Sequence, residues 1–536
     1  MYDLLFREAT IFDGTGGKPF AGDLAVQGDS IAAVGPRVSG DARRVVPAEG
    51  LALSPGFVDI HGHSDYYLLM NPGAEAKVRQ GVTTDVGGNC GYAAAPIAGP
   101  EMEERRKLYR EQYGLEIPFS RLEEYLRHVE DIGVSVNYAP LIGHNTIRSS
   151  VMGGADRPAG PDDMERMERM VDEAMAEGAF GFSTGLVYAP ACFASREELT
   201  ALCRAVARRG GLFATHMRSE GAGLLEAIEE VIGVARDAGI PLQISHLKAA
   251  GESNWDKLEA AFGLIEGARA TGQDVTCDRY PYIASNTHLS ALLPDWVHNG
   301  GMEEKIARLL SPRDRERIRA ELMAAYPAAD YWDRVLISRV LTEENRALEG
   351  LTLAEAAGKR GTDPPAAMMD LLAEEKMNVE ILIFMMSEEN MRSVLRKPYV
   401  MIGSDTGALT HEPPLGNGRP HPRNFGTFPA VLGGFARDEG LFPIEEAIRK
   451  MTSAPCDRMG IADRGRLAAG MKADLVLFDP GRIRETSTYE NPVSYPEGIR
   501  MVLVNGGIVV EEGEHTGARP GRALRKGRAL RKGGSV

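Results

Sequence analysis

Residues Leu51 to Asp65 read L-A-L-S-P-G-F-V-D-I-H-G-H-S-D, and this stretch decides the fold. Its short apolar run, from Gly56 to Ile60, predicts a buried parallel strand that ends in His61 and His63. Side chains two positions apart on a strand point the same way, so the two imidazoles converge at one strand end. Neutral imidazole is a common ligand of zinc and related divalent metals. A bare H-x-H is as often a polar loop, so the metal hypothesis depends on further ligands elsewhere in the chain.

The composition is that of an ordinary soluble globular protein. The chain has 536 residues, 43% hydrophobic and 26% charged, which is enough for a barrel domain and a smaller one. The net charge of −15 argues against a nucleic-acid partner. Five cysteines without close pairs favour a reducing compartment, and no apolar run reaches the ~20 residues of a membrane span. We expect a cytoplasmic enzyme with a small-molecule substrate and no membrane contact, and the sequence leaves its oligomeric state open.

The middle of the chain alternates apolar runs with amphipathic segments. Three of these segments predict helices, Asp162–Glu177, Ser195–Arg209 and Gly223–Ala238. Continuous apolar strands separated by helices indicate a parallel sheet covered by helices, and about eight such units favour a (β/α)8 barrel of the TIM type. The apolar runs start at Gly56, Gly81, Ser135, Gly178, Gly211, Pro241, Asp274 and Tyr399. We therefore predict an α/β fold with a barrel over residues 55–455.

The remaining segments predict additions to that barrel. Short strands in residues 1–54 and 456–516 predict one small β-sandwich built from both chain ends. A charged helical stretch at about 288–346 interrupts the barrel, and we predict an inserted small segment after the sixth strand that walls the active site. Residues 517–536 form a basic tail in which Gly-Arg-Ala-Leu-Arg-Lys occurs twice, at 521–526 and 527–532, and this composition predicts disorder.

Metal-ligand side chains stand at the ends of several predicted strands. A thiol at such a place is often a core residue, and an aspartate often caps the next helix. Together these side chains supply two sets of metal ligands at one rim of one barrel, where such enzymes build their active sites. The six residues are His61, His63, Cys90, His216, His246 and Asp405.

The motifs around these residues resemble the amidohydrolase superfamily and, within it, the D-aminoacylase (N-acyl-D-amino-acid deacylase) family. The first-strand motif of the superfamily is matched by Pro55 to Asp65. The D-aminoacylase group is matched by Gly81-Val82-Thr83-Thr84 followed by Gly88-Asn89-Cys90-Gly91, in which a cysteine replaces the bridging carboxylated lysine of many relatives. Further matches are Ser183–Tyr188, Ser245–Lys248, Asp278–Tyr282, Gly403–Asp405 and His421–Pro429. The resemblance covers nearly the whole chain except the basic tail.

The resemblance implies a zinc-dependent amidohydrolase that cleaves N-acyl-D-amino acids to a carboxylate and a free D-amino acid. A tight zinc site would use Cys90, His216 and His246, and a second, weaker site would use His61, His63 and Asp405. Asp405 would also take the proton of the attacking water and return it to the leaving amine. The substrate carboxylate would be bound by Arg423, Lys248 and Tyr282, and Tyr188 would bind the acyl carbonyl.

Two alternatives stay open at this stage. A cyclic-amide hydrolase of the dihydroorotase or hydantoinase kind shares the barrel, but no lysine occupies a convincing bridging position where Cys90 stands. A catalytically inactive barrel used as a scaffold would be expected to lose metal ligands, whereas this chain keeps all six. A metal assay would separate the scaffold from both enzymes.

Overall fold

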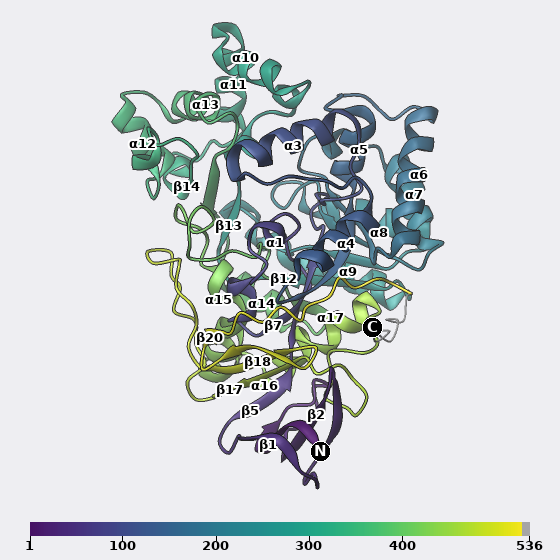
Figure 1. The fold of residues 1–536 in the computed structure, drawn as a ribbon. Helices are drawn as coiled ribbons and strands as arrows, with labels where there is room; N and C mark the ends of the chain where they lie inside the picture. The colour runs from purple at the N-terminus through teal and green to yellow at the C-terminus, as the bar shows by residue number, and fades with distance from the viewer. Residues whose placement is uncertain (528–536) are drawn as a thin grey trace.

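The computed structural model describes residues 1–527, and the predicted barrel forms its centre (Figure 1). Eight parallel strands lie in the order β16-β12-β11-β10-β9-β8-β7-β6. Their bounds are β6 Phe57–Asp59, β7 Val82–Gly87, β8 Asn137–Gly143, β9 Gly181–Gly185, β10 Leu212–His216, β11 Leu242–Ile244, β12 Val275–Arg279 and β16 Val400–Ile402. The predicted α/β class and the (β/α)8 barrel are confirmed.

Helices cover the outside of the barrel, and the three amphipathic segments are among them. They are α6 (Pro161–Glu177), α7 (Arg196–Ala207) and α8 (Leu224–Ala238). Helix α7 begins where the Ser195 hydroxyl accepts a hydrogen bond from the backbone N–H of Glu198, and α8 ends at Gly239, whose φ is +65°. These local signals explain why the sequence located the helices closely.

Among residues 1–527, no helix combines the length and the apolar character needed to cross a bilayer.

The barrel closes between its first and last strands at the segments that carry His61, His63 and Asp405. The backbone N–H of Asp405 donates to the carbonyl of His61, and that of His63 donates to the carbonyl of Thr406, both at 2.8 Å. These bonds lie just beyond the ends of β6 and β16. Closure of the barrel therefore brings residues that are more than 340 positions apart in sequence to one point.

The two chain ends pair as predicted, and the strands of this small β-domain are hydrogen-bonded into one nine-stranded sheet. Strands β1–β5 (Tyr2–Ile11, Phe20–Gln27, Ser30–Gly35, Ala42–Pro47, Ala52–Pro55) join β17–β20 (Leu475–Phe478, Ile499–Val504, Gly507–Glu511, Glu514–His515). The junction is the antiparallel pair β5–β17, in which Leu53 lies opposite Leu477. Because one strand pair joins the two ends directly, all nine strands belong to a single hydrogen-bonded sheet.

The inserted segment follows the seventh barrel strand, β12, rather than the sixth, and it is longer than predicted. Strand β13 (Ala284–His288) pairs antiparallel with β15 (Glu380–Phe384), so the inserted unit runs on to residue 384. Between them lie β14 (Val335–Arg339) and helices α10–α13 (Met302–Leu310, Pro312–Ala325, Leu353–Arg360, Pro364–Glu374). Figure 1 shows these helices as a lobe beside the barrel, and the lobe has its own hydrophobic core.

The expected disorder of residues 517–536 is wrong for residues 517–527, which pack against the amino end of the barrel. The backbone N–H of Leu524 donates to the carbonyl of Tyr138 at 2.7 Å, and the Leu524 side chain joins the core at the barrel floor. The Arg525 guanidinium donates to Glu123 at 3.0 Å and to Glu130 at 2.6 Å. Acidic partners far upstream thus neutralise this part of the basic tail. Residues 528–536 lie outside the described residues.

Candidate metal centre

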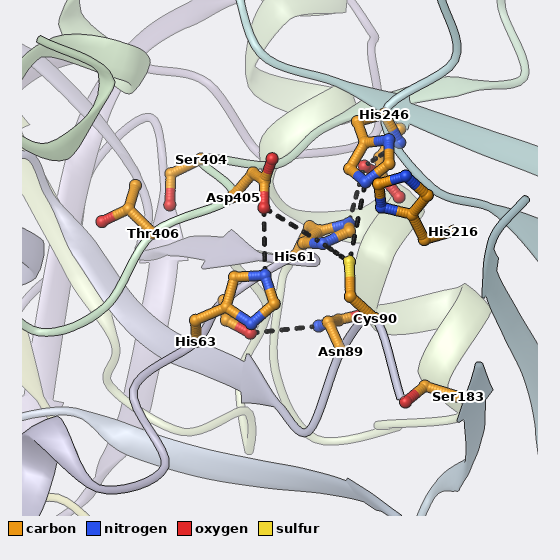
Figure 2. A network of polar contacts seen from close by, with 12 residues as sticks. His61, His63, Asn89, Cys90, Ser183, His216, His246, Ser404, Asp405 and Thr406 are labelled. Atoms are coloured by element: carbon orange, nitrogen blue, oxygen red, sulfur yellow. Dashed lines mark hydrogen bonds and ion pairs between the residues drawn. The ribbon is translucent and has the colours of Figure 1, made fainter. Parts of the chain in front are cut away.

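The structure brings all six predicted ligands together at the carboxyl end of the barrel (Figure 2). His61, His63, Cys90 and Asp405 form one set, and Cys90, His216 and His246 form another. Within each set the possible ligand atoms lie within 4.8 Å of one another. Cys90 belongs to both sets, so its sulfur lies between two candidate metal positions.

Backbone strain is concentrated at three of these residues. Cys90, His246 and Asp405 have φ angles of +51°, +35° and +56°, in the left-handed region that non-glycine residues rarely adopt. The loop around Cys90 is also tightly packed, because a Cβ at Gly88 would lie 2.0 Å from the carbonyl oxygen of Leu141. Strained backbone that the surrounding packing enforces is characteristic of functional sites.

The distances between ligand atoms suit a metal-binding cluster. Cys90 Sγ lies 3.3 Å from His61 Nε2 and 3.6 Å from His246 Nε2, and His63 Nε2 lies 3.0 Å from Asp405 Oδ1. His216 Nδ1 is buried and has no hydrogen-bond partner among the described residues. A buried ring nitrogen without a partner costs free energy unless a ligand satisfies it. One thiol, four imidazoles and one carboxylate are donors that fit a divalent metal such as zinc.

The electrostatic environment favours the metal-binding forms of the anionic ligands. Burial opposes ionisation of Cys90, but the imidazoles of His61, His216 and His246 outweigh it and hold the pKa of the thiol well below its usual value. Burial likewise opposes ionisation of Asp405, and here Arg423 and the histidines hold the pKa of the carboxyl well below its usual value. The site therefore presents a thiolate and a carboxylate.

A carboxylate outside the ligand set orients His61. Asp278 Oδ1 lies 3.1 Å from His61 Nδ1, which turns His61 Nε2 toward Cys90. Asp278 also accepts hydrogen bonds from the backbone N–H of His246 and from Gln243, both at 2.8 Å. Such outer contacts commonly fix the tautomer and orientation of a metal-binding histidine.

A buried ion pair holds the loop that carries Asp405. Lys77 Nζ donates to Asp59 at 2.6 Å, to the Ser404 hydroxyl at 3.0 Å and to the Thr406 carbonyl at 2.9 Å. Asp85 is the second carboxylate near this amine, at 3.4 Å. Lys77 thus fixes both neighbours of Asp405. It lies in the short helix α2 (Glu75–Val78), where nothing in the local sequence signalled this role.

A cavity of about 1450 Å³ opens over the centre, between the barrel rim and the inserted lobe. Its lining includes three of the four predicted substrate-binding residues, Tyr188, Lys248 and Arg423. The Tyr188 ring lies 5.0 Å from that of His216, and Arg423 Nη1 lies 2.8 Å from Asp405 Oδ2. The cavity is ample for a small-molecule ligand.

The prediction for Tyr282 is wrong, and the structure places Tyr280 at the cavity instead. The Tyr282 hydroxyl donates to Glu485 at 2.5 Å, away from the centre. Tyr280 lines the cavity, with the Arg423 guanidinium 4.6 Å and Lys248 Nζ 5.9 Å from the centre of its ring. The Y-P-Y sequence offers a tyrosine on either side of Pro281, and the turn of the chain decides which one faces inward.

Sequence reasoning missed Glu220, which lies in the loop after β10 and lines the same cavity. Its Oε1 lies 2.8 Å from His246 Nδ1 and 2.5 Å from Lys248 Nζ. Glu220 comes four residues after His216, and this proximity was the one sequence signal that could have suggested it.

Comparison with known proteins agrees with this geometry. The amidohydrolase family model matches residues 44–510. D-aminoacylase of Alcaligenes xylosoxydans xylosoxydans is 37% identical over 98% of each chain. A D-aminoacylase structure from work on its binuclear metal centre has a TM-score of 0.83 at 36% identity, covering 98% of this chain and 100% of that one. N-acyl-D-glutamate deacylase of Bordetella bronchiseptica, in complex with zinc and a phosphonate inhibitor, has a TM-score of 0.82 at 31% identity, covering 98% and 99%.

Proposed function

Because the chain belongs to the amidohydrolase family and, within it, to the D-aminoacylase group, we propose that it hydrolyses the amide bond of N-acyl-D-amino acids. The products are a carboxylate and a free D-amino acid. The observation that carries the proposal is the position of Cys90, whose sulfur is shared by two sets of metal ligands beneath a cavity whose lining includes Lys248 and Arg423. The D configuration rests on the activities of the relatives.

We propose zinc as the metal. Cys90, His216 and His246 would hold it tightly, because a thiolate with two imidazoles suits zinc and leaves a position open. His61, His63 and Asp405 would form a second, weaker site. A divalent metal bound here would lower the pKa of a water molecule and polarise the substrate carbonyl. A reducing compartment would keep Cys90 as a free thiolate, so we place the enzyme in the cytoplasm.

The residues around the centre have separate roles in this reaction. Asp405 accepts the proton of the attacking water and returns it to the leaving nitrogen, for which its low pKa makes it an ionised acceptor at neutral pH. Tyr188, beside His216, binds the acyl carbonyl. These groups surround the position that the scissile amide would occupy.

The substrate carboxylate is bound by Arg423, Lys248 and Tyr280. Arg423 Nε is buried and has no hydrogen-bond partner among the described residues, so an anionic ligand would satisfy it. Lys248 and Tyr280 lie near it on the same side of the cavity. This cationic wall supports a substrate with a free carboxylate.

A paired substrate screen tests the proposal. Purified enzyme is assayed with matched N-acetyl-D- and N-acetyl-L-amino acids, and the zinc content of the same preparation is measured. We expect release of free amino acid from the D series, with at least one zinc per chain. Turnover of hydantoins or dihydroorotate in place of N-acetyl-D-amino acids would refute the deacylase proposal. A preparation without metal and without activity on either class would indicate an inactive scaffold.

A further inference from the structure

We propose that Glu220 is a positioning residue which sets the tautomer of His246 and holds Lys248 in place. The inference rests on the proposed metal centre and goes beyond it, because Glu220 belongs to neither set of candidate ligands among the described residues. Its carboxylate lies behind the two histidines of the tight set, on the side away from Cys90.

Each histidine of the tight set turns one ring nitrogen toward Glu220. Glu220 Oε1 lies 2.8 Å from His246 Nδ1, and Oε2 lies 3.8 Å from His216 Nε2. His246 Nε2 faces the centre, 3.6 Å from Cys90 Sγ, and His216 Nδ1 is buried and has no hydrogen-bond partner among the described residues. The Glu220 carboxylate thus lies next to both imidazoles of the tight set.

The position of Lys248 explains why a carboxylate is needed beside His246. Lys248 Nζ lies 2.8 Å from His246 Nδ1, and an ammonium group can only donate hydrogen bonds. If Lys248 donated to Nδ1, the ring proton would sit on Nε2, and Nε2 would have no lone pair for a metal. Glu220 Oε1 can accept from both groups, at 2.5 Å from Lys248 and 2.8 Å from Nδ1. Glu220 accepts a hydrogen bond from Lys248, so Lys248 does not have to donate to Nδ1. The imidazole proton of His246 can then stay on Nδ1, which leaves the lone pair of Nε2 available to a metal.

Glu198 provides a matched control within the same chain. Its Oε1 lies 2.8 Å from His144 Nε2 and 3.1 Å from Arg148 Nε, so a carboxylate again joins a buried histidine and a cation. His144 belongs to neither set of candidate ligands among the described residues. Loss of Glu198 should therefore disturb packing to a similar degree without affecting the metal centre.

The experiment compares Glu220→Gln, Glu198→Gln and wild type by titrating metal-free protein with zinc against a competing chelator. We expect the zinc Kd of Glu220→Gln to rise about 10- to 100-fold, the usual effect of losing an outer partner of a metal-binding histidine. Glu198→Gln should bind zinc as wild type does, even where its Tm falls. With saturating zinc, Glu220→Gln should show a raised KM for an N-acetyl-D-amino acid, because Lys248 has lost its anchor.

A shorter carboxylate separates positioning from general stability. Glu220→Asp keeps the charge, so it should recover part of the zinc affinity that Glu220→Gln loses. Wild-type zinc affinity in Glu220→Gln would overturn the inference, and so would equal losses in Glu220→Gln and Glu198→Gln. The zinc titration needs no substrate. A wild-type protein that binds zinc but cleaves no N-acyl-D-amino acid would thus refute the proposed reaction while leaving the role of Glu220 testable.

Discussion

Replacing Tyr280 by phenylalanine should impair recognition of the substrate carboxylate, whereas the same change at Tyr282 should not. The two side chains are two residues apart but face different surroundings. Tyr280 lines the cavity between Arg423 and Lys248, and the Tyr282 hydroxyl donates to Glu485. Burial would raise the pKa of Tyr280, but the charges of Lys248, Arg279 and Arg423 lower it below its usual value, so its hydroxyl is a strong donor.

The size of the effect follows from the bond that is lost. A hydrogen bond to a charged group contributes about 1.5–3 kcal/mol. At 1.36 kcal/mol per decade, Tyr280→Phe should lower kcat/KM for N-acetyl-D-amino acids roughly 10- to 150-fold. Tyr282→Phe should keep kcat/KM near the wild-type value, but it removes this donor from half-buried Glu485 and should reduce the free energy of unfolding by about 0.5–1.5 kcal/mol.

The assay compares each variant on an N-acetyl-D-amino acid and on the matching carboxamide, which has no carboxylate. Tyr280→Phe should lose activity on the acid and change little on the amide. Urea unfolding of both variants provides the stability control. Equal losses on acid and amide would show that Tyr280 supports the chemistry and not the carboxylate site. A large loss with Tyr282→Phe and none with Tyr280→Phe would restore the prediction made from the sequence.

Three further changes test the centre and its support. Cys90→Ala should remove most bound zinc and nearly all activity, because it deletes the ligand common to both sets; full zinc content by elemental analysis would contradict this. Asp405→Asn should keep the tight zinc and lower kcat about 100- to 10,000-fold, since an amide cannot carry the proton; a loss of only a few-fold would point to another base. Burial raises the pKa of Asp85 to about 6, from an ordinary 3.8, so the folded state holds this proton more tightly than the unfolded state. The wild type should therefore lose about 3 kcal/mol of stability relative to Asp85→Asn as the pH rises from about 4 to above 6, with no further change at higher pH. Urea unfolding across that pH range would show a constant difference if the pKa of Asp85 were normal.

The metal ligands could be predicted because each one ends an apolar run. A parallel strand of a barrel delivers its last residues to a common rim, so the position of His216 or Cys90 in the sequence already implies its neighbours. Glu220 and Lys77 lie in a loop and a short helix, and their roles come from contacts with residues far along the chain. No periodic pattern marks such positions.

The remaining differences have equally local causes. Tyr280 and Tyr282 flank one proline, and only the folded turn shows which side chain faces the cavity. The basic segment around Arg525 has the composition of a solvated tail, but its partners Glu123 and Glu130 lie about 400 residues earlier. The inserted lobe ends with β15, whose apolar side chains could equally have formed a barrel strand.

Because residues 517–527 pack against the barrel floor, this part of the core can be completed only at the end of translation. Leu524 completes a core that also contains Val58 and Leu212, and its backbone pairs with Tyr138. A nascent chain that stops before this segment leaves that apolar floor open to water, however well the metal rim above it has formed. That part of the core is therefore covered only once residues 517–527 have been synthesised. Chains truncated before residue 517 should accumulate poorly in cells, even though they keep every residue of the active site.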